Sequence, residues 1–166
     1  MPLWTTYLAN WTCNRDKIIE YLQAFDSSHG VTTKYVMRNR GNNEIAPLAA
    51  TLLRWKLAEN RFRANQISKE ELEQAWNRYE KEYMAQLTPP MDDDNGAFDW
   101  IANVAHESAE KMHVILVCFE KDAAHCHRRL LAEHVKASWP EIVDYKGELP
   151  NSFLGNGALK DYLLVE

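Results

Sequence analysis

One short segment of this chain gathers the side chains best suited to chemistry. The stretch "VILVCFEKDAAHCHRR" begins as an apolar run and ends in thiols, carboxylates, imidazoles and guanidinium groups. Thiolates are nucleophiles and metal ligands, a carboxylate can transfer protons, and guanidinium groups bind anions. The side chains of interest are Cys118, Glu120, Cys126, His127, Arg128 and Arg129.

A strand followed by a helix would bring these side chains together. The nearly uninterrupted apolar run His113–Phe119 is typical of a strand that is buried on both faces of a parallel sheet. Ligands of open α/β sheets bind at the carboxyl ends of such strands. We expect Asp122 to cap the following helix, at about Ala123–Ser138. The amino end of that helix would favour anions and the thiolate form of Cys126.

The predicted roles follow from these side-chain types. Glu120 is a general acid or base, or the ion-pair partner of Arg128. Cys126 and His127 serve as nucleophile, base or transient metal ligands, while Arg128 binds an anion. Purely structural roles stay open, above all for Cys118, which could be a small hydrophobic residue of the core. The predicted catalytic residues are Glu120, Cys126, His127 and Arg128, and the predicted substrate-binding residues are Arg38, Arg40, Cys118 and Arg129.

Two of the substrate-binding residues come from another part of the chain. Arg38 and Arg40 follow the β-branched run Val31–Met37, which predicts a second strand. They would then lie at the same edge of the sheet as Arg128, where guanidinium groups could clamp a phosphate or carboxylate. The alternative is that both are solvated loop charges.

Familiar cysteine motifs do not fit the segment. A phosphatase-type loop needs arginine six positions after cysteine, and those positions hold Ala124 and Ala132. Seven residues separate Cys118 from Cys126, unlike the short ligand pairs of common zinc sites. The sequence therefore leaves the cofactor unknown and we assign no metal ligand, although a zinc or iron site built from Cys118, Cys126 and His127 stays open.

Strands and helices alternate along the sequence. The capping-box pattern "SKEE" marks the start of one long helix. The alternation predicts an α/β fold: a small, mostly parallel sheet flanked by helices, Rossmann-like and three-layered, with a helical hairpin inserted. Residues 146–157 resemble a loop-like tail. Strands are expected at Leu3–Leu8, Val31–Met37, His113–Phe119 and Glu141–Tyr145, and helices at Arg15–Phe25, Pro47–Arg61, Ser68–Leu87, Phe98–Ala105 and Ala123–Ser138.

Composition narrows the class of protein. A chain of 166 residues suits one α/β domain over residues 1–166. The net charge of −5 excludes a generally basic surface for nucleic acid. Three cysteines, an odd number, indicate a reducing compartment. The start of the chain lacks signal-peptide character and no apolar run reaches transmembrane length, so we expect a cytoplasmic protein without a membrane partner.

The segment "LVCFEKDAAHCHRRLLAEHV" resembles the signature of the domain of unknown function 488 family. That signature is a hydrophobic strand, a cysteine, a glutamate two residues later, and a Cys-His-Arg triplet at the start of a helix. The segments "ISKEELEQAWNRYEKEYMAQL" and "YKGEL" resemble further parts of the family, whereas the N-terminal half departs most from it. The resemblance implies an α/β fold and the position of the site, but no particular reaction. The matching residues are Cys118, Glu120, Cys126, His127 and Arg128.

Three functions stay open at this point: an enzyme, a non-catalytic binding module and a metal-binding protein. The first is an enzyme acting on a small anionic substrate, nucleotide-like or derived from nucleic acid, through the Cys/Glu/His/Arg site. The second is a module that binds nucleotide or nucleic acid without catalysis, and the third is a metal-binding protein. A small anionic ligand is the predicted partner; the net charge does not support nucleic acid, and the sequence does not indicate an oligomeric state.

Overall fold

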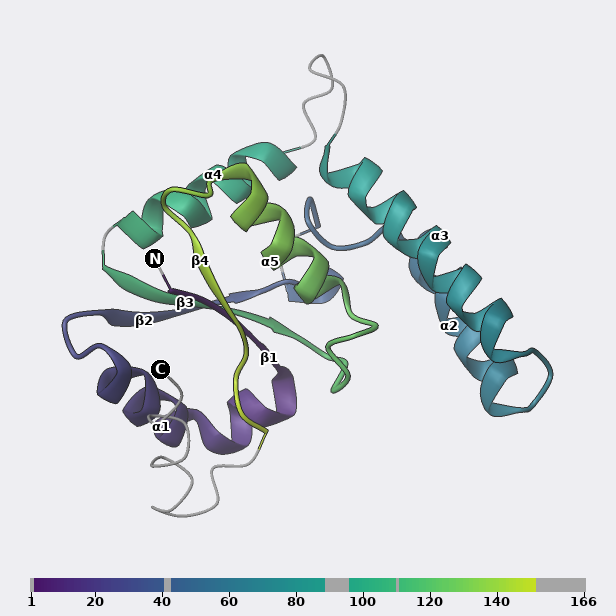
Figure 1. The fold of residues 1–166 in the computed structure, drawn as a ribbon, viewed down its shortest axis with the longest axis horizontal. Coiled ribbons are helices and arrows are strands. Elements are labelled where there is room, and N and C mark those ends of the chain that lie inside the picture. The colour runs from purple at the N-terminus through teal and green to yellow at the C-terminus, as the bar shows by residue number, and fades with distance from the viewer. Residues whose placement is uncertain (1, 41–42, 89–95, 110, 152–166) are drawn as a thin grey trace.

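Four parallel strands form the centre of the protein (Figure 1). The computed structural model describes residues 2–40, 43–88, 96–109 and 111–151. Within this part of the chain the strands run in the order β2-β3-β1-β4, so β3 and β1 lie in the middle. Their bounds are β1 Pro2–Tyr7, β2 Gly30–Tyr35, β3 Met112–Cys118 and β4 Asp144–Glu148.

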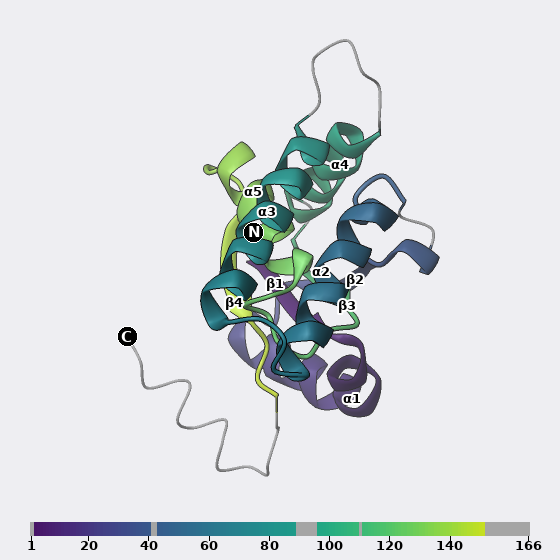
Figure 2. The same ribbon diagram turned by 90° about the vertical axis from the view of Figure 1, so that its right-hand side faces the viewer.

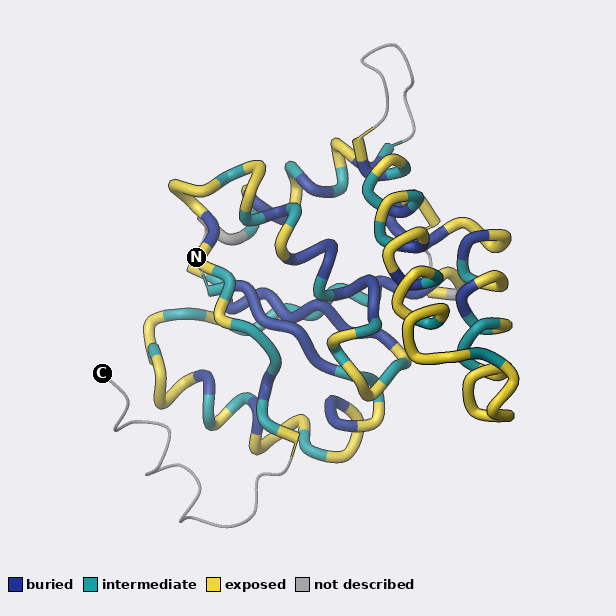
Figure 3. Tube along the Cα trace, turned by 45° about the vertical axis from the view of Figure 1, so that its right-hand side comes forward, coloured by how far each residue is buried: buried dark blue, intermediate teal, exposed yellow. Residues whose placement is uncertain are grey.

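Helices cover both faces of this sheet, which confirms the three-layer α/β class. Helix α1 lies on one face, and α4 and α5 lie on the other (Figures 1 and 3). Helices α2 and α3 form a hairpin that projects sideways beyond the sheet (Figure 1) and therefore lies in front of the sheet in the view turned by 90° (Figure 2). None of the helices in the described ranges is long and apolar enough to cross a membrane. The helices are α1 Leu8–Phe25, α2 Ala49–Arg63, α3 Lys69–Leu87, α4 Ala97–Ala109 and α5 His127–Ser138, and Arg38–Arg40 form a 3₁₀ turn.

Strand β3 belongs to both cores because neighbouring residues of a strand point to opposite faces. Val114 and Leu116 pack into the larger core with α3, α4 and α5. Ile115 and Val117 pack against the apolar face of α1. All four side chains are fully buried, as expected for a strand whose sequence is apolar without alternation.

The start of α3 confirms the predicted capping box. The backbone N–H of Glu71 donates to the Ser68 hydroxyl at 3.2 Å, and the Glu71 carboxylate accepts from the Ser68 N–H at 2.8 Å. The apolar stripe of the helix is buried down to Leu87. Within it, the Tyr83 hydroxyl donates to the Ile45 carbonyl at 2.6 Å and so attaches α3 to the segment before α2.

The predicted start of α5 is wrong by several residues. The helix begins at His127, and Cys126 is its N-cap residue. Asp122 instead accepts a hydrogen bond from the backbone N–H of Ala124 at 2.9 Å, which closes a local turn of the kind that aspartate favours. The residues between Asp122 and His127 are therefore a turn, and Cys126 lies at the tip of the helix.

Other boundaries differ for local reasons. Helix α1 begins at Leu8 and is kinked at Asn14, so the expected helix from Arg15 is only its second part. Strand β4 runs to Glu148 and takes in residues expected in a loop-like tail. The pairing with β1 contains a bulge, and Gly147 has a positive φ of 93°. These irregularities interrupt the regular alternation of residues by which a strand is recognised in a sequence. The rest of that predicted tail, from residue 152 onward, lies outside the described residues.

The topology creates a switch point between β1 and β3. The chain leaves β1 into α1 on one face of the sheet, and leaves β3 toward α5 on the other face (Figure 1). Tyr7 and Cys118, the last residues of these neighbouring strands, are paired in the register. Open α/β sheets bind ligands at such a switch point.

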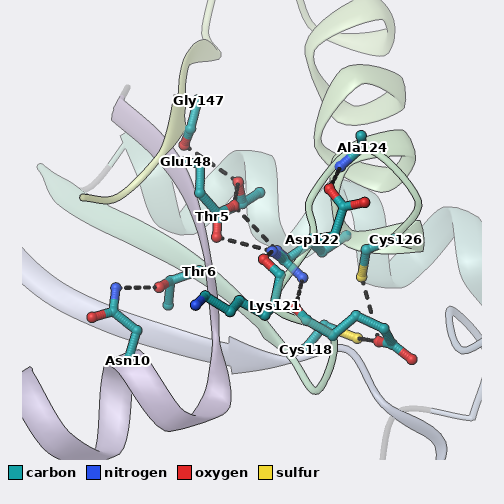
Figure 4. Close-up of polar contacts among 12 residues, drawn as sticks. Thr5, Thr6, Asn10, Cys118, Lys121, Asp122, Ala124, Cys126, Gly147 and Glu148 are labelled. Carbon is teal, nitrogen blue, oxygen red and sulfur yellow. Dashed lines mark hydrogen bonds and ion pairs between the residues drawn. The ribbon is translucent and has the colours of Figure 1, made fainter. Parts of the chain in front are cut away.

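A buried arginine holds this edge of the sheet together. Arg128 has no exposed surface, and its Nη2 and Nε lie 2.9 and 3.1 Å from the two carboxylate oxygens of Glu148. Its Nη1 donates to the Glu120 carbonyl, and its Nη2 also donates to the Lys121 carbonyl at 3.2 Å. Thr5 donates to Glu148 at 2.7 Å (Figure 4). Arg128 thus connects α5, β4, β1 and the loop after β3.

Replacing Glu148 by alanine tests this connection. Glu148→Ala leaves the buried guanidinium without its counter-charge, and we expect the free energy of unfolding to fall by about 3 kcal/mol in urea denaturation. The matched control is Glu107→Ala, which removes the part-exposed ion pair with Lys34. That change is expected to cost less than about 1 kcal/mol. Equal losses in the two variants would contradict the role given to Arg128.

Candidate functional site

Four side chains with metal-ligating or reactive atoms meet at the carboxyl end of β3. Cys118 ends the strand, Glu120 follows in the loop, Cys126 is the N-cap of α5, and His127 is the first residue of that helix. One sulfur, nitrogen or oxygen atom from each lies within 4.8 Å of all the others. We call these residues the four-residue cluster. Figure 4 shows its two cysteines converging from the strand and the helix tip.

Glu120 links the two thiols to the helical hairpin. Its Oε2 lies 3.1 Å from the sulfur of Cys118 and 3.6 Å from that of Cys126, so both thiols can donate to one carboxylate oxygen. Its Oε1 lies 3.3 Å from the Nζ of Lys56 on α2. The side chain of Glu120 is 24% exposed, whereas Cys118 and Cys126 are only 1% and 2% exposed. Solvent therefore reaches the cluster from the side of Glu120 and Lys56.

The ring of His127 is oriented by a backbone carbonyl. Its Nε2 lies 2.7 Å from the carbonyl oxygen of Val36, just after β2, so this nitrogen carries the donated hydrogen. In the neutral ring Nδ1 then has a free lone pair, and both ring nitrogens lie 3.7 Å from the sulfur of Cys118. The ring edge of Tyr83 packs against the imidazole with centroids 5.6 Å apart.

The electrostatics of the cluster shift the pKa values of its two thiols in opposite directions. Burial alone would raise the pKa of Cys126, but hydrogen bonds with Cys118 and His127 and the charges of His127 and Arg128 outweigh it and lower that pKa. The pKa of Cys118 is raised by its hydrogen bond to Cys126, by burial and by the negative charges of Cys126 and Glu120. These surroundings favour the thiolate form of Cys126 and the thiol form of Cys118.

The other two ionisable groups respond to the same neighbours. Burial would raise the pKa of Glu120, yet the hydrogen bond from Cys118 and the charge of Lys56 help to lower it to about 2. Burial would lower the pKa of His127, but the hydrogen bond to Cys126 and the Cys126 charge raise it above its usual value. A carboxylate and a thiolate therefore face an imidazole that tends to be protonated.

Aromatic residues of the hairpin form one wall of the site. Tyr79 on α3 is buried, and burial together with the negative charges of Cys126 and Cys118 raises the pKa of its hydroxyl. Trp55 on α2 stacks on His125 with ring centroids 5.4 Å apart. The hairpin insertion thus contributes directly to the surroundings of the cluster.

Four of the predicted site residues belong to this cluster, and the four arginines make other contacts. Arg128 is engaged by Glu148 and two carbonyls. Arg129 lies on the hairpin side of α5, where it pairs with Glu80 at 3.0 Å and with Glu133 at 2.9 Å. Arg38 donates to the Pro47 carbonyl at 2.9 Å, and Arg40 lies 5.6 Å above the ring of Tyr35.

Several residues of the site could not be found by sequence reasoning. Lys56 belongs to "RWKLAENRFR", a pattern that an ordinary charged helix face explains equally well. Val36 acts through its backbone carbonyl, which any residue would offer. The only indication in the sequence that Glu148 matters is the resemblance of "YKGEL" to the closing segment of a family.

Comparison with known proteins agrees with the resemblance in the sequence. The family model described as the active DUF488-N3 subclade matches residues 11–138, a range that contains the four-residue cluster and the helical hairpin. No curated protein and no solved structure gives a significant match. Because the family model covers more than half of the sequence, the chain belongs to the DUF488 family.

Proposed function

We propose that this protein is a cytoplasmic, metal-dependent enzyme that acts on a small anionic, nucleotide-like substrate. Cys118, Cys126 and His127 would hold one divalent ion, for which zinc is the best match, and Glu120 would transfer protons beside it. The observation that carries the proposal is the convergence of four ligand atoms within 4.8 Å. In tetrahedral zinc sites the ligand atoms lie roughly 3.3–3.8 Å apart, so small side-chain rotations would suffice.

The orientation of His127 supports a metal ligand. Metal-binding histidines generally donate their second ring N–H to a carbonyl or carboxylate, which fixes the ring and the tautomer. The 2.7 Å contact from Nε2 to the Val36 carbonyl is such an interaction. It leaves Nδ1, which lies 3.7 Å from the sulfur of Cys118, as the ring nitrogen with a lone pair for a metal ion.

Burial favours a metal ligand over a free nucleophile. A cysteine nucleophile must touch the reacting atom of a nucleotide-sized substrate, and both cysteines of the cluster are too deeply buried for a molecule of that size, although not for one as small as a peroxide. A metal ion needs only that its ligands face one another. Two cysteines and one histidine form a known catalytic zinc set that leaves one coordination position for substrate or water.

The catalytic part of the proposal depends on Glu120 and Lys56. A divalent ion would act as a Lewis acid that stabilises negative charge on a substrate oxygen. Glu120 is the carboxylate on the solvent side, and this position supports its assignment to proton transfer. Lys56 is the cation we assign to an anionic substrate, since the guanidinium of Arg128 is already engaged. The family model that matches the chain is that of an active subclade, which supports a catalytic role.

Metal analysis tests the centre itself. We expect purified protein to carry close to one zinc per chain. We also expect the apo protein to take up Co²⁺ with thiolate charge-transfer and tetrahedral d–d bands. Cys126→Ser should weaken binding by more than the roughly 10- to 100-fold lost with outer-shell residues. Cys13→Ser, at the exposed third cysteine, should bind normally. An unchanged cobalt spectrum in Cys126→Ser would refute the assignment.

A second variant separates metal binding from catalysis. Nucleoside mono- and diphosphates are incubated with the zinc-loaded protein, and products are separated by chromatography. For any substrate that turns over, Glu120→Gln should lower kcat by about 10²- to 10⁴-fold while zinc content is retained. Glu59→Gln is the matched control, because Glu59 is the other carboxylate on Lys56, at 2.9 Å. Loss of zinc from Glu120→Gln would make Glu120 a ligand instead.

A further inference from the structure

We propose that Cys118 and Cys126 form a redox-active pair, which a peroxide converts into an intramolecular disulfide. The two sulfurs contact the same carboxylate oxygen of Glu120, at 3.1 and 3.6 Å, and lie within 4.8 Å of each other. A disulfide requires a sulfur–sulfur distance of about 2.05 Å. The remaining approach is within the reach of a cysteine side-chain rotation together with a small movement of one backbone segment.

The backbone is fixed at one of the two cysteines and can move at the other, so one sulfur can approach the other. Cys118 is fixed at the end of a central strand, where it is paired with Tyr7 of β1. Cys126 stands between a turn and the first residue of α5, and its N–H donates to the Ala123 carbonyl at 3.3 Å. Cys126 is therefore the residue that moves toward Cys118.

The third cysteine does not compete for this bond. Cys13 is exposed and belongs to α1, which covers the opposite face of the sheet from α5 (Figure 1). Cys118 and Cys126 both belong to the core on the α5 side. The structure therefore pairs Cys118 with Cys126 and leaves Cys13 as an internal control.

The reaction needs only the oxidant as co-reactant. One thiol sulfur attacks a peroxide oxygen, the O–O bond breaks, and a sulfenic acid and one water form. The second sulfur attacks the sulfenic sulfur, which forms the S–S bond and releases a second water after proton transfer. Two thiols lose two electrons and two hydrogens, and hydrogen peroxide is reduced to two waters. Glu120 borders the entry side and contacts both sulfurs, so it is placed to carry the protons.

Disulfide formation would also switch off the metal centre. A disulfide sulfur is no longer a thiolate ligand, so two of the three proposed ligands are lost at once. This consequence rests on the proposed function, whereas the disulfide itself does not. Cytosolic disulfides that form transiently are commonly redox-sensing, and a reducing agent would restore the site.

Peptide mapping of the full chain tests the disulfide. The metal-free, reduced Cys13→Ser protein is treated with equimolar hydrogen peroxide, alkylated and digested with trypsin. Trypsin cuts after Lys111, Lys121 and Arg128, so the two cysteines fall on separate peptides. We expect one disulfide-linked pair, Met112–Lys121 with Asp122–Arg128, which dithiothreitol separates. Cys13→Ser/Cys126→Ser should give no linked pair. Two alkylated peptides, or separate sulfinic acids, would overturn the proposal.

A metal-loaded arm distinguishes this proposal from the preceding one. Zinc-loaded Cys13→Ser protein is treated in the same way in the presence of a chromophoric chelator, and we expect one zinc released per disulfide formed. If the protein binds no zinc, the proposed function fails while the mapping still decides on the disulfide. If zinc is bound but neither the metal-free nor the zinc-loaded protein gives the linked peptide, only the redox proposal fails.

Discussion

The site depends on the burial of one guanidinium group. A cation without exposed surface is tolerated only when its hydrogen-bond donors are satisfied and its charge is paired. Arg128 meets this requirement with the carboxylate of Glu148 and with the carbonyls of Glu120 and Lys121. Those carbonyls belong to the loop after β3, so the arginine fixes the backbone that directs Glu120 toward the sulfurs. The guanidinium group of Arg128 is therefore used to hold the loop after β3 in position and is not free to bind an external anion.

The two cationic side chains near the cluster therefore have different tasks. Arg128 is engaged on the sheet side, where its planar fork suits the bidentate contact with Glu148. Lys56 reaches the cluster from α2, and its flexible ammonium group is half-buried beside Glu120. The α/β edge thus supplies the sulfur and imidazole groups, while the hairpin supplies the mobile cation and the aromatic wall. The hairpin is part of the site and more than an insertion.

The sequence predicts the parts of this arrangement that depend on local pattern. The apolar run before Cys118 identifies β3, the rule for parallel sheets places Cys118 and Glu120 at its carboxyl end, and "SKEE" marks the start of α3. The predicted start of α5 is wrong because Asp122 does not cap the helix. Its carboxylate instead accepts a hydrogen bond from the backbone N–H of Ala124 in a turn. The roles of Arg128 and Lys56 depend on partners distant in sequence. Glu148 belongs to β4, whose sequence pattern is made irregular by a bulge. Lys56 and Glu120 are far apart in the sequence, so no local spacing predicts their contact.

The charges of the cluster explain why its geometry suits a cation. Cys118, Glu120 and Cys126 are all groups that become negative, and like charges at these distances oppose one another's ionisation. In the protein alone, this conflict is resolved by a raised pKa that keeps Cys118 a thiol. Lys56 offsets part of the remaining charge from the solvent side, and His127 offsets part of it from within. A divalent ion among the ligand atoms would remove the conflict, because it would stabilise both thiolates at once. The same crowding of two sulfurs around one carboxylate oxygen makes their oxidation to a disulfide an alternative way to remove that negative charge.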